Sequence, residues 1–110
     1  MTALKYRILI DRRAQDDLNE FYEYLREYSE STALKYVEAF YDAVDQTLAE
    51  FPHSCAFLPE IGAPYRGLLF RVSKRTAFWV IFTVHDETHE VRILRFWNAA
   101  REPGTHGVGA

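Results

Sequence analysis

A chain of 110 residues is long enough to bury one hydrophobic core and too short for two domains. Hydrophobic residues make up 48% of the chain and charged residues 26%, a balance typical of globular proteins that argues against intrinsic disorder. Cys55 is the only cysteine, no apolar run approaches the length of a membrane span, and residues 1–7 lack the apolar run of a signal peptide, so we expect a cytoplasmic protein without an intrachain disulfide.

The first half of the chain predicts one strand followed by two amphipathic helices. Residues 4–10 form the expected strand, and Asp11 is a suitable N-cap for the first helix. An apolar stripe with the period of a helix follows at Ala14, Leu18, Phe21, Tyr22 and Leu25. After a hydroxyl-rich break at 29–32, a second stripe comprises Ala33, Val37, Phe40, Tyr41, Val44, Leu48 and Phe51. Pro52 should end this helix, and the short break predicts an antiparallel helical hairpin.

The second half predicts a loop at 52–66 and three strands joined by tight turns. The strands are expected at residues 68–73, 77–84 and 90–97. The predicted fold is therefore α+β with the order β-α-α-β-β-β: an antiparallel sheet, a two-helix hairpin packed on one face, and the first strand at an edge. We expect a single domain over residues 1–102 and a glycine-rich tail at 103–110.

The formal net charge of −3 is divided unevenly along this order of elements. Residues 1–13 carry a net charge of +3, residues 14–51 carry ten acids and two bases, and residues 52–110 carry a net charge of +2. The helical half is thus acidic and the sheet half basic. A surface that serves only solubility would intersperse the two signs, so the division points to charged partners.

The sequence holds no motif for a metal or a cofactor, and we expect neither. His85 and His89 flank a predicted turn instead of sharing a helix face, and the five glycines do not have the spacing of a phosphate-binding loop. The carboxylates of the helices are most simply a solvated face. Ordinary motifs therefore do not identify an active site.

The arginines of the sheet half are the remaining candidates for chemistry. Alternation in the last strand would place Val91, Ile93 and Arg95 on one face. It would place Arg92, Leu94 and Phe96 on the other. An arginine beside aromatic side chains on an open sheet suits binding of phosphate or carboxylate, or stacking on a nucleic-acid base. The alternative is that the arginines pair with the helical acids or only solubilise the sheet.

Several stretches have an order and spacing typical of one protein family. In the first helix these are residues 13–18 with Phe21, Tyr22, Tyr24 and Leu25. In the second helix they are Ala33, Tyr36, Leu48, Phe51 and Pro52. In the strands they are residues 80–84, 91–96 and 101–103. Together they resemble the RelE/ParE family of toxins from type II toxin–antitoxin systems, over almost the whole chain up to Pro103.

The resemblance implies a toxin that a cognate antitoxin holds inactive in a toxin–antitoxin hetero-oligomer. It does not imply binding to a membrane. Family members either cleave mRNA on the ribosome or, as ParE-like proteins, act on DNA gyrase. In a RelE-like endoribonuclease the catalytic residues here would be Arg71, Arg95 and Arg101. Residues expected to contact the target or the antitoxin are Lys74, Arg75, Trp79, Trp97 and Asn98.

Two departures from the cleaving members favour the ParE-like branch. Trp79 stands where those members often carry arginine, and Asn98 stands where many carry histidine, so a group that could move a proton is not evident. We therefore expect a growth-inhibiting toxin that binds a protein target such as DNA gyrase. The alternatives are a ribosome-dependent mRNA interferase and a non-toxic binding module derived from a toxin.

Overall fold

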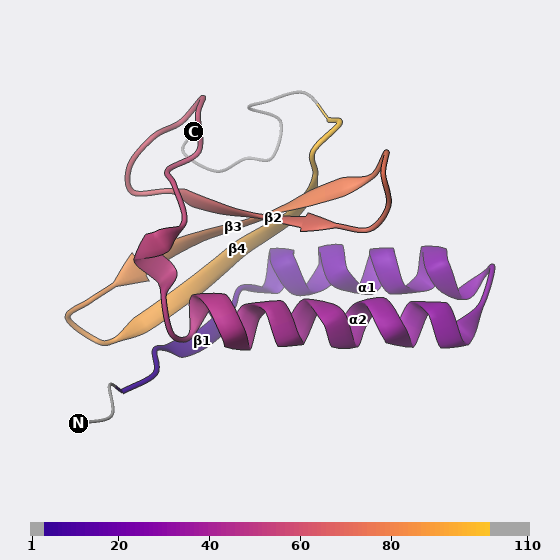
Figure 1. Cartoon of the computed structure of the whole chain (residues 1–110), viewed down its shortest axis with the longest axis horizontal. Helices are drawn as coiled ribbons and strands as arrows, with labels where there is room; N and C mark the ends of the chain where they lie inside the picture. Colours follow the sequence, from indigo (N-terminus) through magenta and orange to yellow (C-terminus); the bar gives the residue numbers. More distant parts are fainter. Residues whose placement is uncertain (1–3, 102–110) are drawn as a thin grey trace.

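Two helices pack against one face of a four-stranded sheet (Figure 1). The computed structural model describes residues 4–101. The helices are α1 (Arg12–Arg26) and α2 (Glu30–Ala43), and the strands are β1 (Arg7–Ile10), β2 (Arg66–Arg71), β3 (Ala77–His85) and β4 (Glu90–Asn98). The expected α+β class and element order are confirmed. The expected tail at 103–110 lies outside the described residues.

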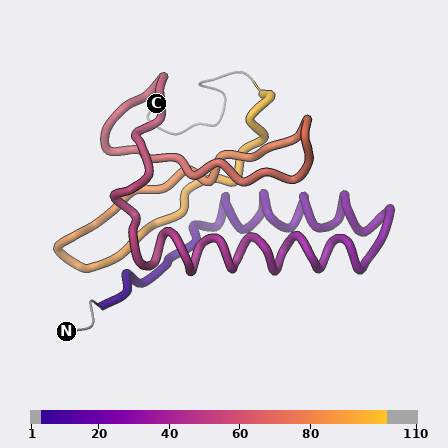
Figure 2. Tube along the Cα trace, viewed as in Figure 1, coloured from indigo at the N-terminus to yellow at the C-terminus, as the bar shows by residue number. Residues whose placement is uncertain are grey.

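The sheet is mixed, whereas an antiparallel sheet was expected. Its strand order is β1-β4-β3-β2, and β2, β3 and β4 form the expected antiparallel meander. β1 lies at an edge as expected but runs parallel to β4, with Ile8 opposite Val91. In the Cα trace, β1 lies beside β4 although both helices and two strands separate them in the sequence (Figure 2). That crossover supplies the long connection a parallel pair requires, and the strand pattern alone does not fix the direction of an edge strand.

An irregularity in β4 overturns the expected alternation of its side chains. Ile81 of β3 lies opposite Arg95, but the next residue, Phe82, lies opposite Ile93, so Leu94 is an extra residue in β4. Before this bulge Ile93 faces the helices, and after it Phe96 does so as well. Arg95 therefore lies on the opposite face from Ile93, and the prediction that the two share a face was wrong.

The helices follow their apolar stripes, with one departure in α2. Asp11 occupies the N-cap position of α1, although its side chain makes no capping hydrogen bond, and Ser29 caps α2 by accepting from the Thr32 N–H at 3.3 Å. α2 then passes into a π-helical turn, Val44–Leu48, which adds a residue to the turn. The extra residue rotates the stripe, so Phe51 is 64% exposed where burial was expected.

A hydrophobic core lies on each face of the sheet. The larger one fills the space between helices and sheet, and its largest aromatic members are Phe21, Phe40, Phe70, Phe82 and Phe96. The smaller one lies on the outer face and consists of Leu58, Ile81 and Trp97, with Ile61, Tyr65 and Trp79 packed against it. β3 is therefore covered on both faces, with Val80 and Phe82 in the larger core and Ile81 in the smaller one. The connector between α2 and β2 covers the outer face, and Leu58 donates its N–H to the carbonyl of Tyr65 at 2.8 Å.

Gly67 permits this outer core to close. A Cβ atom at this position would lie 2.7 Å from Cδ2 of Leu58 and 2.8 Å from the ring of Trp79. We expect Gly67→Ala to lower the free energy of unfolding by about 1–3 kcal/mol because the overpacked ring and the connector must separate. Urea denaturation followed by tryptophan fluorescence checks this. An unchanged midpoint with unchanged native emission would show that the outer core tolerates a methyl group here.

Hydrogen bonds to acidic side chains fasten the β3–β4 turn to the rest of the chain. The carboxylate of Asp86 accepts from the Tyr6 hydroxyl at 2.6 Å and lies 2.9 Å from Nε2 of His53. Both contacts lower the pKa of Asp86. Hydrogen bonds from Arg7 and Thr88 lower the pKa of Glu90 in the same way. The start of the chain and the connector are thereby tied to this turn.

These lowered pKa values predict how stability depends on pH. A carboxyl group with a depressed pKa in the folded state stabilises the fold above its unfolded pKa of about 4, and this contribution is lost as the pH falls further. We expect the free energy of unfolding to decrease as the pH is lowered below about 4. Asp86→Asn should make this decrease with pH smaller. Glu87→Gln is the control, since Glu87 makes no hydrogen bond or ion pair within residues 4–101. Identical pH profiles for both variants would contradict the assignment to Asp86.

Candidate functional site

The edge of β4 beyond β1 is closed by a side chain instead of a strand. β1 pairs with β4 only as far as Ile93. Past that point the carboxylate of Asp17, from the second turn of α1, accepts from the backbone N–H of Phe96 at 3.1 Å. It also accepts from Nε and Nη2 of Arg95 at 2.7 and 3.0 Å. The two side chains are 14% and 11% exposed, so this fork of charge-assisted hydrogen bonds is shielded from water.

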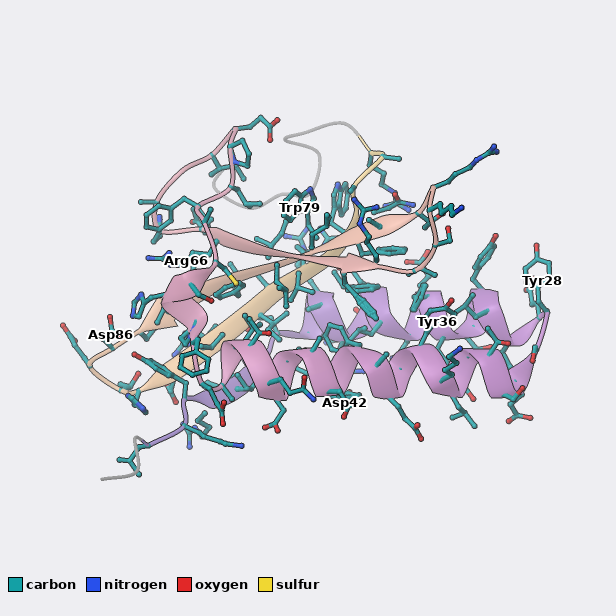
Figure 3. All side chains as sticks on the ribbon, viewed as in Figure 1. Tyr28, Tyr36, Asp42, Arg66, Trp79 and Asp86 are labelled. Carbon is teal, nitrogen blue, oxygen red and sulfur yellow. The ribbon has the colours of Figure 1, made fainter. Side chains whose placement is uncertain are left out.

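Arginines flank a tryptophan on the outer face of the same end of the sheet. The guanidinium carbon of Arg95 lies 4.7 Å from the ring centre of Trp97, and that of Arg101 lies 4.9 Å from it. Trp79 is opposite Trp97 in the neighbouring strand and lies on the side of the sheet away from the helices (Figure 3). Leu69 continues the row on β2. We call the row Leu69, Trp79 and Trp97 with Arg95 and Arg101 the outer tryptophan patch.

On the helix side of this end, α1 and the sheet enclose a groove of about 440 Å³. Its α1 wall consists of Asp17, Glu20, Phe21, Tyr24 and Leu25. Its sheet wall consists of Val72, Thr76, Phe78, Phe96, Asn98 and Arg101. The rings of Phe78 and Phe96 are stacked at 4.4 Å, and Phe21 meets Phe78 edge-on at 5.0 Å, so the deep part of the groove is aromatic.

The groove opens to solvent between charged side chains. Glu20 and Arg101 are exposed, and Tyr24 stands 59% exposed at its mouth. A cleft of this size with apolar walls and a few polar groups at its mouth is typical of a binding site. Catalysis would need a positioned proton-transfer group, whereas binding of an apolar segment needs only these walls.

Comparison with known proteins assigns the chain to a family. A family model described as the ParE toxin of the type II toxin–antitoxin system parDE matches residues 8–103. The chain belongs to the ParE toxin family. It is the toxin component of a type II toxin–antitoxin system, and its partner is a cognate antitoxin.

A solved structure agrees with this assignment. The chain is similar to a protein of the chromosomal ParDE toxin–antitoxin system from P. aeruginosa, with 26% sequence identity and a TM-score of 0.65. The match covers 84% of this chain and 95% of that one. A search of curated protein sequences found no match. No helix within residues 4–101 is long and apolar enough to cross a membrane.

In this ParE-family chain, the residues predicted from the sequence gather at one end of the sheet but on different sides of it. Arg95, Trp79, Trp97 and Arg101 meet in the outer tryptophan patch. Arg71 ends β2 on the same face, opposite Ala77. Their roles in catalysis or binding stay predictions.

The other predicted residues belong to the groove lining or to the turn between its lining residues Val72 and Thr76. Lys74 and Arg75 are exposed in the turn between β2 and β3. Asn98 lines the groove, and its side-chain oxygen accepts from the Ala100 N–H at 2.9 Å. Arg101 belongs to both places, because it lines the groove and also stacks on Trp97.

Sequence reasoning missed the α1 wall. Glu20 was interpreted as part of a solvated helix face together with the other helical carboxylates, and Tyr24 was quoted only within the family motif. The signal that could have found them is Tyr24, a large ring next to the stripe residue Leu25 that extends the apolar face sideways. Asp17 was quoted within a family motif, but nothing in the motif indicated that it would bind Arg95 and a strand edge.

The Asp17 fork predicts a large loss of stability on truncation. We expect Asp17→Ala to lower the free energy of unfolding by about 2–4 kcal/mol, because Arg95 loses two charge-assisted hydrogen bonds to Asp17 and the Phe96 N–H loses its acceptor. The matched control is Asp16→Ala at the neighbouring exposed acid, for which we expect a change within about 0.5 kcal/mol. Both are measured by urea denaturation. Equal losses for the two variants would show that the edge of β4 is satisfied without Asp17.

Proposed function

We propose that this toxin arrests growth by binding DNA gyrase and not by cutting RNA. The observation that carries the proposal is the engagement of Arg95. RNA cleavage needs a cation at the scissile phosphate and a group that moves the proton of the 2′-hydroxyl. The Arg95 guanidinium, one of three expected to serve as that cation with those of Arg71 and Arg101, is bound by the two oxygens of Asp17 and is 11% exposed. A guanidinium group that donates two hydrogen bonds to a shielded carboxylate stabilises the fold and is poorly placed to bind a phosphate.

The chemistry of the outer tryptophan patch supports a protein target. Tryptophan and arginine are enriched among the residues that dominate binding energy at protein interfaces. Trp97 itself is only 7% exposed, beneath Arg95 and Arg101, so the surface open to a partner consists of Arg101, the partly exposed Trp79 and the exposed Leu69. Arg71, exposed at the end of β2, adds a cation at the border of this surface.

The antitoxin belongs in the groove in this proposal. The aromatic walls at Phe21, Phe78 and Phe96 offer apolar area to a segment that lies over them. The groove adjoins the outer tryptophan patch through Arg101. A segment bound there would lie beside the surface proposed for the target, which is where an inhibitor of the toxin would act.

Two assays on the purified toxin test the target. We expect inhibition of DNA supercoiling by gyrase and no cleavage of mRNA on the ribosome. Arg71→Ala should weaken the inhibition at least about tenfold, a loss of about 1.4 kcal/mol at the interface. Arg92→Ala is the matched control, since Arg92 is an exposed arginine nearer the opposite end of β4.

Other outcomes discriminate between the alternatives. Message cut on the ribosome, with supercoiling unaffected, would overturn the proposal in favour of an mRNA interferase. In that case Arg71→Ala and Arg101→Ala should abolish cleavage in folded protein. Vigorous growth of bacteria that express the soluble chain alone, with neither assay positive, would instead indicate a non-toxic binding module.

A further inference from the structure

The two walls of the groove carry opposite charges. On the α1 wall, Glu20 makes no ion pair within the described chain, and it lies one turn from Asp16 and from Glu23. Like charges three and four residues apart destabilise a helix, and among these three acids only Glu23 has a cationic partner, Arg26 at 3.0 Å. The α1 wall therefore holds negative charge that the fold itself does not neutralise.

The sheet wall holds the complementary excess. Arg101 lines it, and Lys74 and Arg75 lie in the turn between the two lining residues Val72 and Thr76. No carboxylate of residues 4–101 forms an ion pair with any of these three cations. An apolar channel is thus bordered by acids on one side and by bases on the other.

We propose that the groove selects an amphipathic segment of the antitoxin whose two flanks carry opposite charges. The segment turns an apolar stripe to the aromatic walls, an acidic flank to the β2–β3 turn and Arg101, and a basic flank to Glu20 and α1. This inference rests on the proposed function, in which the antitoxin lies in the groove. For a segment with given flanks only one direction along the groove avoids opposing like charges, so the walls also set its direction.

The charges of the walls disfavour other occupants. A nucleic acid would bring its phosphates against Glu20 and the acids beside it. The helices that a second copy of this chain would offer are net acidic, since residues 12–43 carry four bases against eight acids, so they provide no net basic flank for α1. A uniformly acidic or basic segment would satisfy one wall and be repelled by the other.

Synthetic helical peptides of about 20 residues test the inference. One peptide carries a leucine stripe with glutamates along one flank and lysines along the other, and a second has the same composition with the charges mixed on both flanks. We expect the toxin to bind the polarised peptide at least about tenfold more tightly at low salt, measured by fluorescence anisotropy. Equal affinities would overturn the inference, as would failure of both peptides to bind.

Charge reversals in the toxin sharpen the test. Glu20→Lys and Arg101→Glu should each weaken binding of the polarised peptide about fivefold or more, because one wall then repels its flank. The double variant should restore part of the affinity, since the peptide can then bind in the reverse direction while Lys74, Arg75 and the other acids of α1 keep their charges. Glu38→Lys, a reversal at an exposed acid of α2 outside the groove lining, is the control and should change the affinity less than either single variant.

The results separate this inference from the proposed function. If the double variant does not recover peptide binding, although it and the two single variants keep the native unfolding midpoint, the polarity of the walls does not determine the partner. Inhibition of gyrase by the unmodified toxin is measured without any peptide. If the toxin inhibits gyrase but binds the two peptides with equal affinity, the inference is overturned and the proposed target stands.

Discussion

The carboxylate of Asp17 is the constraint on which the rest of this end of the molecule depends. β1 stops pairing at Ile93, which leaves the following backbone of β4 as an open edge under α1. An unpaired N–H in such a place is costly, and a buried guanidinium without a counter-charge is costlier. Asp17 satisfies the Phe96 N–H and Arg95 together. One side chain thus fixes the distance between helix and sheet and closes the edge that the short first strand leaves.

The bulge at Leu94 makes this arrangement possible. One extra residue moves Arg95 to the outer face beside Trp97 and returns Phe96 to the inner core. Phe96 there contacts aromatic rings from both helices and from strands β2 and β3, namely Phe21, Phe40, Phe70 and Phe78. In regular alternation Arg95 would point into that core and Phe96 would point out of it. The bulge therefore determines which residues form the groove and which form the outer tryptophan patch.

Much of the fold could be predicted from the sequence, because helical stripes, caps and strand runs are local signals. The π-helical turn at Val44–Leu48 and the bulge at Leu94 could not, since each is stabilised by packing between distant elements and has no local signature. The same reason explains the incomplete prediction of the site. Arginines on strands mark a basic sheet by composition, but the α1 wall depends on how Tyr24 and Glu20 face Val72 and Arg101 across a groove between elements far apart in the chain.

The divided charge of the chain has two uses in the folded molecule, and they differ in kind. Arg95 does pair with a helical acid, and Arg66 binds the Cys55 carbonyl at 2.6 Å and stacks on Phe57, so these two arginines serve the fold. Arg101 and Glu20 do not meet each other, because the groove separates them. A surface that only had to be soluble could carry a base in place of Glu20 and an acid in place of Arg101. This exchange would relieve the repulsion between acids along α1 without changing the core. Charges that the fold does not neutralise lie on both sides of an apolar groove. This arrangement is expected of a surface whose charges are neutralised by a bound partner.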